Sequence, residues 1–127
     1  MFRDFGEDNI GKKLYLGRLF SFYGELLSAG QKEACGLYLE EDLSIGEVAL
    51  QLSVTRQGVY DTLNRAFSKL EGFEEKLGLC DRFDAVQREL VAMKEEMKRL
   101  VPEEGSRDVY EDCLLRLDAL TEIEEQE

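Results

Sequence analysis

Histidine and tryptophan are absent from this 127-residue chain, and proline occurs once, as Pro102. Without histidine the chain lacks the commonest general base and the commonest side-chain ligand of transition metals. The cysteines, Cys35, Cys80 and Cys113, lie far apart without metal-ligand spacing, and there is no glycine-rich phosphate-binding loop. The sequence therefore predicts a protein that is not an enzyme and uses no cofactor or metal.

Long apolar runs are also missing. No stretch approaches the roughly 20 apolar residues that a membrane-spanning helix needs, and the N-terminus lacks the apolar centre of a signal peptide. An odd number of scattered cysteines without a secretion signal is typical of reduced thiols. We therefore expect a cytoplasmic protein that does not insert into a membrane.

Acidic side chains outnumber basic ones by 28 to 16, and the excess is uneven along the chain. Residues 1–70 carry a net charge of −2, whereas residues 71–127 carry a net charge of −10. Phosphate repels an acidic segment, so the second half is unsuited to lie on nucleic acid. Both a solvated acidic surface and a docking face for a basic partner protein fit this charge.

The sequence does contain apolar residues that recur at helical spacing. With one proline and no alternating strand pattern, most of the chain is free to be helical. Apolar residues recur at helical spacing over about residues 12–27, and Ser28 with Gln31 forms the capping-box pattern that begins a second helix. We expect an all-α protein of about six helices, with a helix-turn-helix domain at residues 1–79 and an acidic C-terminal helical hairpin at residues 80–127.

The stretch 43–70 has the pattern of a helix-turn-helix. Ser44 followed by Glu47 predicts a capping box for a short helix, and Thr55 predicts the cap of a longer one. The turn between them contains Val54, which is expected to fill the helix crossing. Apolar spacing predicts the buried face of the second helix: Val59, Leu63, Ala66 or Phe67, and Leu70. In this motif the second helix can enter a DNA major groove.

The exposed face of that second helix supplies the candidate nucleic-acid-binding residues. They are the side chains that could meet phosphates or bases: Thr55, Arg56, Gln57, Tyr60, Asn64, Arg65 and Lys69. Gly58 offers no side chain near the helix start, where base-reading residues project, and Asp61 would face phosphate. With so few cations the nonspecific attraction to nucleic acid is small. The alternative is a scaffold whose exposed face meets protein or RNA.

Two later segments have the spacing of paired coiled-coil helices. Over about residues 80–101, apolar residues recur at intervals of 3, 4, 3, 4 and 3: Phe83, Val86, Leu90, Met93, Met97 and Leu100. A second row has intervals of 3, 4 and 3: Tyr110, Cys113, Leu117 and Leu120. The loop between them predicts an antiparallel hairpin. Its seam could pack on the first four helices or on a second copy, and surplus aromatic surface on the first helix leads us to predict a homodimer.

Three motifs of the first domain resemble the YlxM family of small bacterial helix-turn-helix proteins. The matching segments are Leu19–Leu27, Leu39–Ala49 and Val54–Arg65, the last with the run V-T-R-Q-G-V-Y-D. The resemblance covers about residues 16–79, and the hairpin is similar only in being helical and acidic. It implies a fold like region 4 of sigma factors, in the winged-helix-like DNA-binding class without a wing.

The same resemblance implies a function. The family is associated with the signal recognition particle, which implies a cytosolic accessory or regulatory protein of protein targeting that binds the particle's protein or RNA. The second hypothesis is a DNA-binding transcriptional regulator, since the helix-turn-helix is a DNA-reading motif. Gly58 stands where alanine is common in the family, which weakens the case for DNA and leaves the fold intact.

Overall fold

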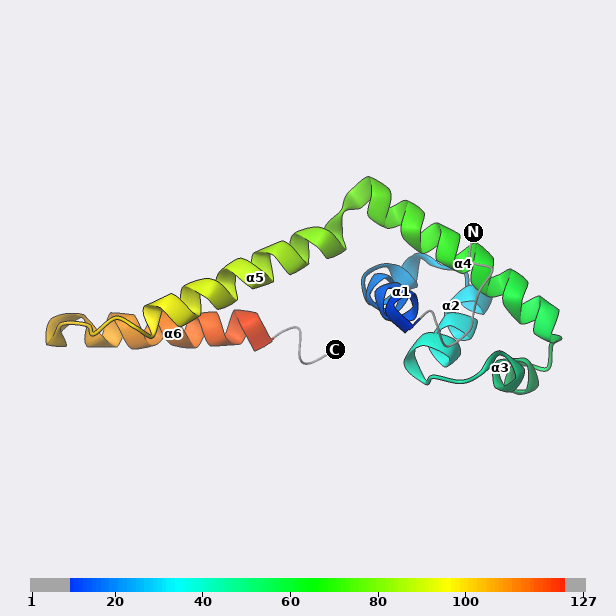
Figure 1. The fold of residues 1–127 in the computed structure, drawn as a ribbon, viewed down its shortest axis with the longest axis horizontal. Coiled ribbons are helices and arrows are strands. Elements are labelled where there is room, and N and C mark those ends of the chain that lie inside the picture. The colour runs from blue at the N-terminus through cyan, green and yellow to red at the C-terminus, as the bar shows by residue number, and fades with distance from the viewer. Residues whose placement is uncertain (1–9, 123–127) are drawn as a thin grey trace. The chain divides into compact units, whose positions relative to one another are not determined.

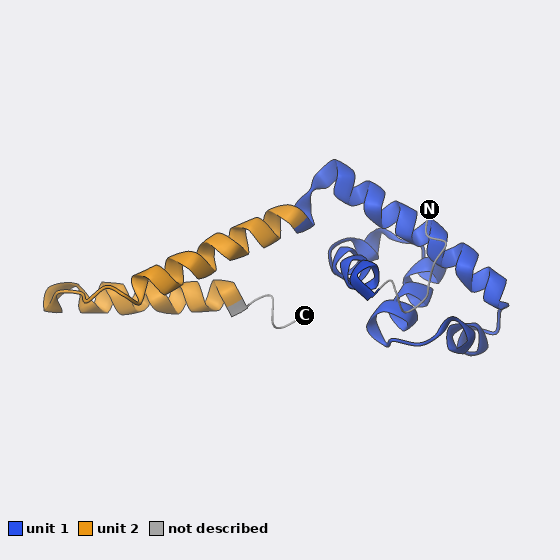
Figure 2. Ribbon diagram, in the orientation of Figure 1, with its two compact units in different colours: residues 1–80 blue, residues 81–127 orange. Residues whose placement is uncertain are grey.

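The chain divides into two compact units, Met1–Cys80 and Asp81–Glu127 (Figure 2). The structure, a computed structural model, describes residues 10–122, and every regular element in that range is helical (Figure 1). The sequence-based prediction of an all-α protein with a helix-turn-helix and a C-terminal helical hairpin is confirmed.

Unit 1 contains four helices joined by short turns. In chain order they are α1 (Ile10–Tyr23), a 3-10 turn (Gly24–Leu26), α2 (Ala29–Cys35), a π-helical turn (Gly36–Glu40), α3 (Ile45–Leu52) and α4 (Arg56–Leu77). The helices α1, α2 and α3 each pack against the long helix α4 (Figure 1). The helix-turn-helix consists of α3, the turn after it and the first half of α4.

Local sequence signals decide where these helices begin and end. Ser28 and Ser44 both close the expected capping boxes, and Thr55 Oγ1 accepts a hydrogen bond from the backbone N–H of Gly58 (2.9 Å). Helix α4 ends at Gly78, whose φ of 61° is left-handed, a conformation that glycine adopts without strain. The three helix starts that the sequence predicts, at Ser28, Ser44 and Thr55, are confirmed.

The capping box of α3 makes stability depend on pH. Hydrogen bonds from the backbone N–H (2.9 Å) and the hydroxyl of Ser44 lower the pKa of Glu47 below its ordinary value of 4.5. A carboxylate whose pKa falls on folding stabilises the fold above its ordinary pKa, and this contribution is lost as the pH falls through the lowered value. We therefore expect the stability difference between wild type and Glu47→Gln to shrink below about pH 4.5 in urea titrations. A difference that stays constant with pH would contradict this role.

The core of unit 1 lies between α4 and the three shorter helices. The inward residues that the sequence predicts for α4, Val59, Leu63 and Leu70, are buried, and both of the alternatives Ala66 and Phe67 are buried as well. They meet Leu19 and Tyr23 of α1, Cys35 of α2 and Val48 of α3 in one apolar cluster. Burial raises the pKa of the Cys35 thiol to about 12, so it is a protonated core residue at neutral pH.

Val54 departs from its predicted position. The sequence places it inside the crossing of α3 and α4, but its side chain is 50% exposed. Ser53 adopts a left-handed conformation (φ 56°), and the N–H of Val54 donates to the carbonyl oxygen of Ala49 (3.0 Å), so α3 ends in a tight reversal. The reversal leaves Val54 on the rim of a groove. The buried side chains nearest the turn are instead Val48, Ala49 and Val59.

Unit 2 is an antiparallel helical hairpin. It is formed by α5 (Leu79–Met97) from Asp81 onward, a loop containing a 3-10 turn (Glu104–Ser106), and α6 (Arg107–Glu122) (Figure 2). The helix α5 ends before the predicted position 101. The backbone N–H groups of Arg99 and Leu100 bond to carbonyls three residues back (3.1 and 3.0 Å), which tightens the last turn, and Pro102 disfavours a helical residue before it.

The two hairpin helices meet along a different row from the predicted one. Five predicted seam residues are exposed: Val86, Met93, Leu100, Cys113 and Leu120. Buried or half-buried side chains form the actual seam: Phe83, Gln87, Leu90, Lys94 and Met97 on α5, and Tyr110, Leu114, Leu117 and Thr121 on α6. The prediction of a hairpin is therefore right, and the prediction of its buried row is wrong in every second position.

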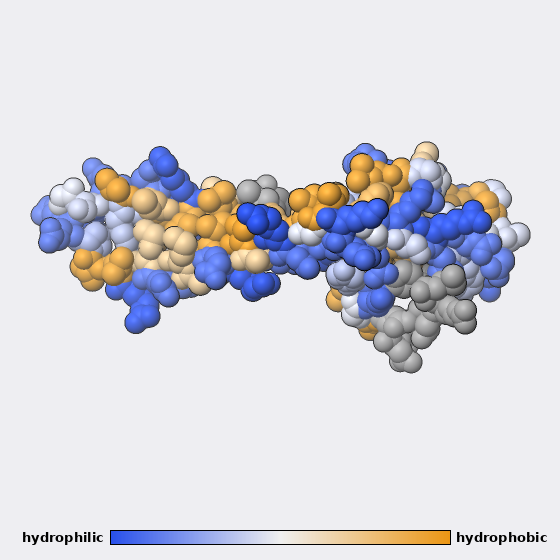
Figure 3. Space-filling view, turned by 90° about the horizontal axis from the view of Figure 1, so that it is seen from above, coloured by the Kyte–Doolittle hydropathy of each residue, from blue (hydrophilic) through white to orange (hydrophobic). Residues whose placement is uncertain are grey.

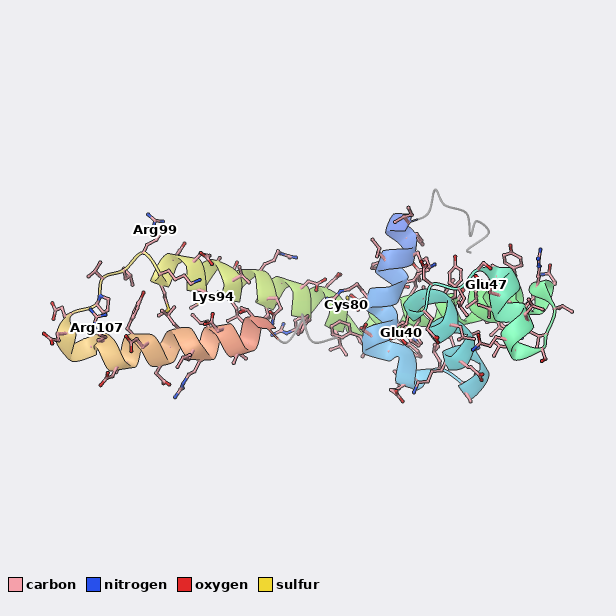
Figure 4. All side chains as sticks on the ribbon, turned by 90° about the horizontal axis from the view of Figure 1, so that it is seen from below. Glu40, Glu47, Cys80, Lys94, Arg99 and Arg107 are labelled. Atoms are coloured by element: carbon pink, nitrogen blue, oxygen red, sulfur yellow. The ribbon has the colours of Figure 1, made fainter. Side chains whose placement is uncertain are left out.

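Polar bonds across the hairpin explain this rotation. Gln87 Nε2 donates to the carbonyl oxygen of Leu120 (3.0 Å), and the Tyr110 hydroxyl donates to the carbonyl oxygen of Met97 (2.7 Å). Lys94 lies in the seam (Figure 4), with its Nζ 3.3 Å from Asp118 Oδ1. A buried polar group without a partner is costly, and in this position Gln87 Nε2, Lys94 and the Tyr110 hydroxyl have partners, whereas Gln87 Oε1 is buried without one among the described residues.

Candidate nucleic-acid interface

A groove lies on the helix-turn-helix side of unit 1. It has a volume of about 610 Å³ and is bounded by the start of α2, the end of α3 and the first turns of α4. Its lining includes Gln31 and Glu33 of α2, Gln51 of α3, Val54 of the turn, and Thr62 and Arg65 of α4. The groove is mixed in character, because amide, hydroxyl and charged groups alternate with apolar ones.

The predicted site residues of α4 divide between two flanks of the helix. Arg65 borders the groove, and Lys69, one turn later, reaches Gln31 of the groove wall. Arg56, Tyr60 and Asn64, spaced four residues apart, follow the opposite flank. Thr55 precedes the helix, and its hydroxyl oxygen accepts the capping hydrogen bond from the N–H of Gly58. The structure therefore does not gather these residues into one surface.

Arg56 rests on the backbone of α3. A Cβ atom added at Gly46 would lie 3.0 Å from Arg56 Nη2, closer than such contacts normally are. The guanidinium therefore occupies the space that the missing side chain leaves. Sequence reasoning did not single out Gly46 as a contact of Arg56, because nothing in the local pattern of α3 shows which distant side chain covers it.

Three further site residues have neighbours or surroundings that restrict them. Gln57 Nε2 donates to Asp61 Oδ1 (3.0 Å), one turn along the same helix face. Asn64 is half-buried, and its Oδ1 is buried without a hydrogen-bond partner among the described residues. Tyr60 is half-buried as well. Gln57 and Asn64 are the two candidates for pairing with adenine, and neither side chain is free to reach a base without rearranging.

Cations near the motif are largely neutralised by carboxylates. Three lysines form ion pairs, measured from the ammonium nitrogen to a carboxylate oxygen. The distance is 3.7 Å for Lys12 and Glu71, 2.5 Å for Lys13 and Asp42, and 2.5 Å for Lys32 and Glu25. The hydrogen bond and charge of Lys13 lower the pKa of Asp42. Exposed pairs of this kind contribute little stability, but they reduce the positive potential that a phosphate would meet.

Arg65 is different from these cations. It is exposed, it borders the groove, and it forms no ion pair with any residue in the described range. Lys69, its neighbour on the same flank, donates to the neutral Gln31 Oε1 (3.1 Å) and keeps its charge uncompensated there. Two cations without an ion pair among the described residues, Arg65 and Lys69, therefore lie on the groove side of α4, and the acid Glu33 also lines the groove.

A buried polar cluster at the end of unit 1 is absent from the sequence-based expectations. The Tyr23 hydroxyl donates to Glu74 Oε1 (2.6 Å) and accepts from the N–H of Leu79 (3.1 Å), and the same Glu74 oxygen accepts from the N–H of Cys80 (3.0 Å). The cluster therefore caps the first N–H groups of α5. The sequence does contain an indication that Glu74 is buried, because Glu74 lies four residues after Leu70 and therefore on the buried row of α4.

Two further features of the described range concern membranes and metals. None of its helices is both long and apolar enough to cross a bilayer. Within residues 10–122, no three His, Cys, Asp or Glu side chains are grouped so that they could hold a metal ion.

Comparison with known proteins identifies a family whose model spans the described residues, and relatives that match part of the chain. The model of one family, UPF0122, described as "Putative helix-turn-helix protein, YlxM / p13 like", matches residues 10–124. A UPF0122 protein of Thermoanaerobacter sp. (strain X514) is 47% identical over 81 residues, which cover 64% of this chain and 69% of the relative. One from Bacillus cereus (strain AH187) is 43% identical over 93 residues, 73% of this chain and 81% of the relative.

A third relative, from Desulforamulus reducens (strain MI-1), is 49% identical over 73 residues, 58% of this chain and 62% of the relative. The family match extends through the hairpin, whereas the resemblance seen in the sequence covers only about residues 16–79. The predicted family is thereby confirmed, and the chain belongs to the UPF0122 family of YlxM/p13-like helix-turn-helix proteins.

Proposed function

We propose that this protein is a non-enzymatic accessory or regulatory protein of the signal recognition particle pathway. Its helix-turn-helix unit would bind the particle's protein or RNA through the groove side of α4. Membership of the family supports the regulatory type of function, and the resemblance of the sequence motifs supports the pathway. The observation that carries the choice of surface is the uncompensated positive charge of Arg65 and Lys69 beside the groove.

The charge around the motif favours this partner over duplex DNA. Each phosphate contact on duplex DNA contributes to affinity by releasing counterions, and the effect scales with the number of contacts. Lys12, Lys13 and Lys32 are already paired with carboxylates, which leaves two or three cations for phosphates. A groove with amide and apolar walls instead fits an irregular protein segment or an unpaired stretch of RNA.

A DNA-binding transcriptional regulator is the alternative function. The favourable observation is geometric: α3, the left-handed turn at Ser53 and α4 form a helix-turn-helix, which places the start of α4 where a recognition helix contacts bases. The exposed row of α4 nevertheless places the carboxylate of Asp61 one turn from Gln57, and the two are bonded to each other. We therefore rank this alternative second.

Removing the charge of Arg65 tests the proposal. If its guanidinium pairs with a phosphate or carboxylate of the particle, Arg65→Ala should weaken binding by about tenfold or more, since a charged hydrogen bond is worth about 1.5–3 kcal/mol. The measurement is fluorescence anisotropy of the full-length protein with three separate probes: the particle's protein subunit, its RNA, and a random-sequence DNA duplex. Arg99→Ala, which removes a hairpin arginine (Figure 4), is the matched control.

The three probes separate the two functions. Binding to the particle's protein or RNA that Arg65→Ala weakens and Arg99→Ala preserves would support the proposal. Tight binding to the DNA duplex alone, with a steep dependence on salt, would favour the transcriptional regulator. Undiminished binding of the particle by Arg65→Ala would show that the groove side of α4 is not the interface.

A further inference from the structure

The helix α5 carries two rows of side chains at coiled-coil spacing, and the hairpin uses only one of them. Both rows share Phe83, Leu90 and Met97. The inner row is completed by Gln87 and Lys94, which face α6 through the bonds described above. The outer row is completed by Val86 and Met93, which are 44% and 51% exposed. One side of α5 is therefore apolar and about half exposed at Val86 and Met93.

The helix α6 repeats this arrangement. Its inner row contains Leu114 and Thr121, and its outer row contains Cys113 and Leu120, each one residue earlier. In an antiparallel pair, residues that precede the seam positions by one lie on the same side of both helices. Val86, Met93, Cys113 and Leu120 therefore form one face, which we call the outer face. Apolar residues gather on the hairpin surface in the space-filling view (Figure 3).

The spacing of the residues on the outer face determines which kind of secondary structure can pack against it. Its residues recur at intervals of 3 and 4 on both helices, and such rows leave the holes into which side chains of another α-helix insert. Between residues 81 and 121 of the hairpin, only Gln87 and Leu117 are buried, with 7% and 8% of their surface exposed. A third helix lying in the furrow between α5 and α6 would complete a three-helix core.

The charge beside the outer face decides the chemistry of that helix. Glu89 and Glu96 are exposed and lie on α5 next to Val86 and Met93, at the same intervals of 3 and 4. On α6 the adjacent base, Arg116, is paired with Asp112 (3.0 Å). We propose that the outer face binds an amphipathic helix of a partner protein, with apolar residues at coiled-coil spacing and Lys or Arg along the edge that meets Glu89 and Glu96.

A second copy of the hairpin fits this face less well than a basic helix. Residues 81–127 carry 15 acidic and 7 basic side chains, so two hairpins repel each other. The exposed carboxylates of Glu89 and Glu96 would meet an equally acidic flank or the already paired Arg116. This charge argument opposes the homodimer that the sequence predicts. The oligomeric state is therefore one outcome of the test.

Two designed peptides serve as probes. Both have three heptads, roughly 31 Å as a helix, with the same leucine seam. One carries lysine and the other glutamate at the flanking positions. The lysine peptide should bind the full-length protein in fluorescence anisotropy about tenfold or more tightly than the glutamate peptide, and salt should reduce the difference. Equal binding of both peptides, or of neither, would overturn the proposal.

A matched pair of variants locates the binding face. Val86 and Val91 are the same residue type on the same helix and are both 44% exposed, but only Val86 belongs to the outer face. Val86→Glu should abolish binding of the lysine peptide because it places a charge inside the apolar contact, whereas Val91→Glu should leave it unchanged. Equal effects of the two variants would contradict the assignment. Circular dichroism checks that both stay helical.

Charge reversal tests the acidic flank without touching the apolar row. The double variant Glu89→Lys, Glu96→Lys should lose its preference for the lysine peptide and acquire one for the glutamate peptide. An unchanged preference would overturn the assigned role of these carboxylates. Sedimentation equilibrium of wild type without peptide should show a single species at 14.6 kDa. A doubled mass that Val86→Glu returns to one chain would identify a second copy as the occupant and overturn the basic-helix proposal.

Discussion

Leu63→Ala should lower the free energy of unfolding by about 2–5 kcal/mol, because deleting a buried leucine side chain leaves a cavity in a packed core. Leu63 is fully buried in the middle of α4, within the cluster that also contains Leu19, Val48 and Phe67. Neighbouring side chains from three helices surround it, so the site cannot collapse without moving a helix. Urea denaturation, with the midpoint and slope both fitted, measures the loss.

An exposed leucine provides the control for this prediction. Leu50 of α3 is 83% exposed, so Leu50→Ala makes the same chemical change without opening a cavity. Leu50→Ala should change the free energy of unfolding by no more than about 0.5 kcal/mol. A loss of less than about 1 kcal/mol for Leu63→Ala would mean that the inner face of α4 is assigned incorrectly.

Glu74→Ala should destabilise unit 1 by an amount comparable to Leu63→Ala. It removes the acceptor of the buried Tyr23 hydroxyl and of the Cys80 N–H, and each buried polar group left without a partner costs about 1–3 kcal/mol. Glu74→Gln retains a carbonyl oxygen at the acceptor position and should recover part of the loss. Glu75→Ala, a substitution at the exposed neighbouring residue, should be nearly neutral.

The same cluster should produce an alkaline pH dependence. Burial, reinforced by the hydrogen bond to Glu74, raises the pKa of Tyr23 above its ordinary value of 10.0. A group whose pKa rises on folding contributes stability that is complete below the ordinary pKa and is lost as the pH rises through the folded value. Wild type should therefore lose stability above about pH 10 more steeply than Tyr23→Phe. Parallel profiles of the two proteins in urea titrations would exclude this role of Tyr23.

The candidate site shows which features a sequence pattern can predict and which it cannot. The residues predicted to meet nucleic acid are polar residues of α4 and its N-cap Thr55, and the structure places Arg65 and Lys69 on one flank and Arg56 on the other. Their partners come from α2 and α3, at positions 31 and 46. No spacing rule within α4 connects Arg56 to Gly46, so the division of the site between two flanks becomes visible only when the helices are packed.

What the sequence by itself determined is the set of features that depend on residues within about one helical turn. Ser28, Ser44 and Thr55 cap helices because each lies three residues before the N–H group that it accepts from. Gly78 ends α4 because glycine tolerates the left-handed backbone. The inner face of α4 follows from apolar periodicity, since helical geometry places residues three or four apart on one side.

What only the tertiary structure decided is the choice between alternative rows of one helix. Two rows on α5 share Phe83, Leu90 and Met97, and apolar spacing favours the row with Val86 and Met93, although the hairpin buries the other. The bond from Gln87 to a carbonyl 33 residues away selects the inner row and leaves Val86 exposed. Glu74 is buried for the same reason, because Tyr23, 51 residues away in sequence, supplies the hydrogen bond that makes its burial tolerable.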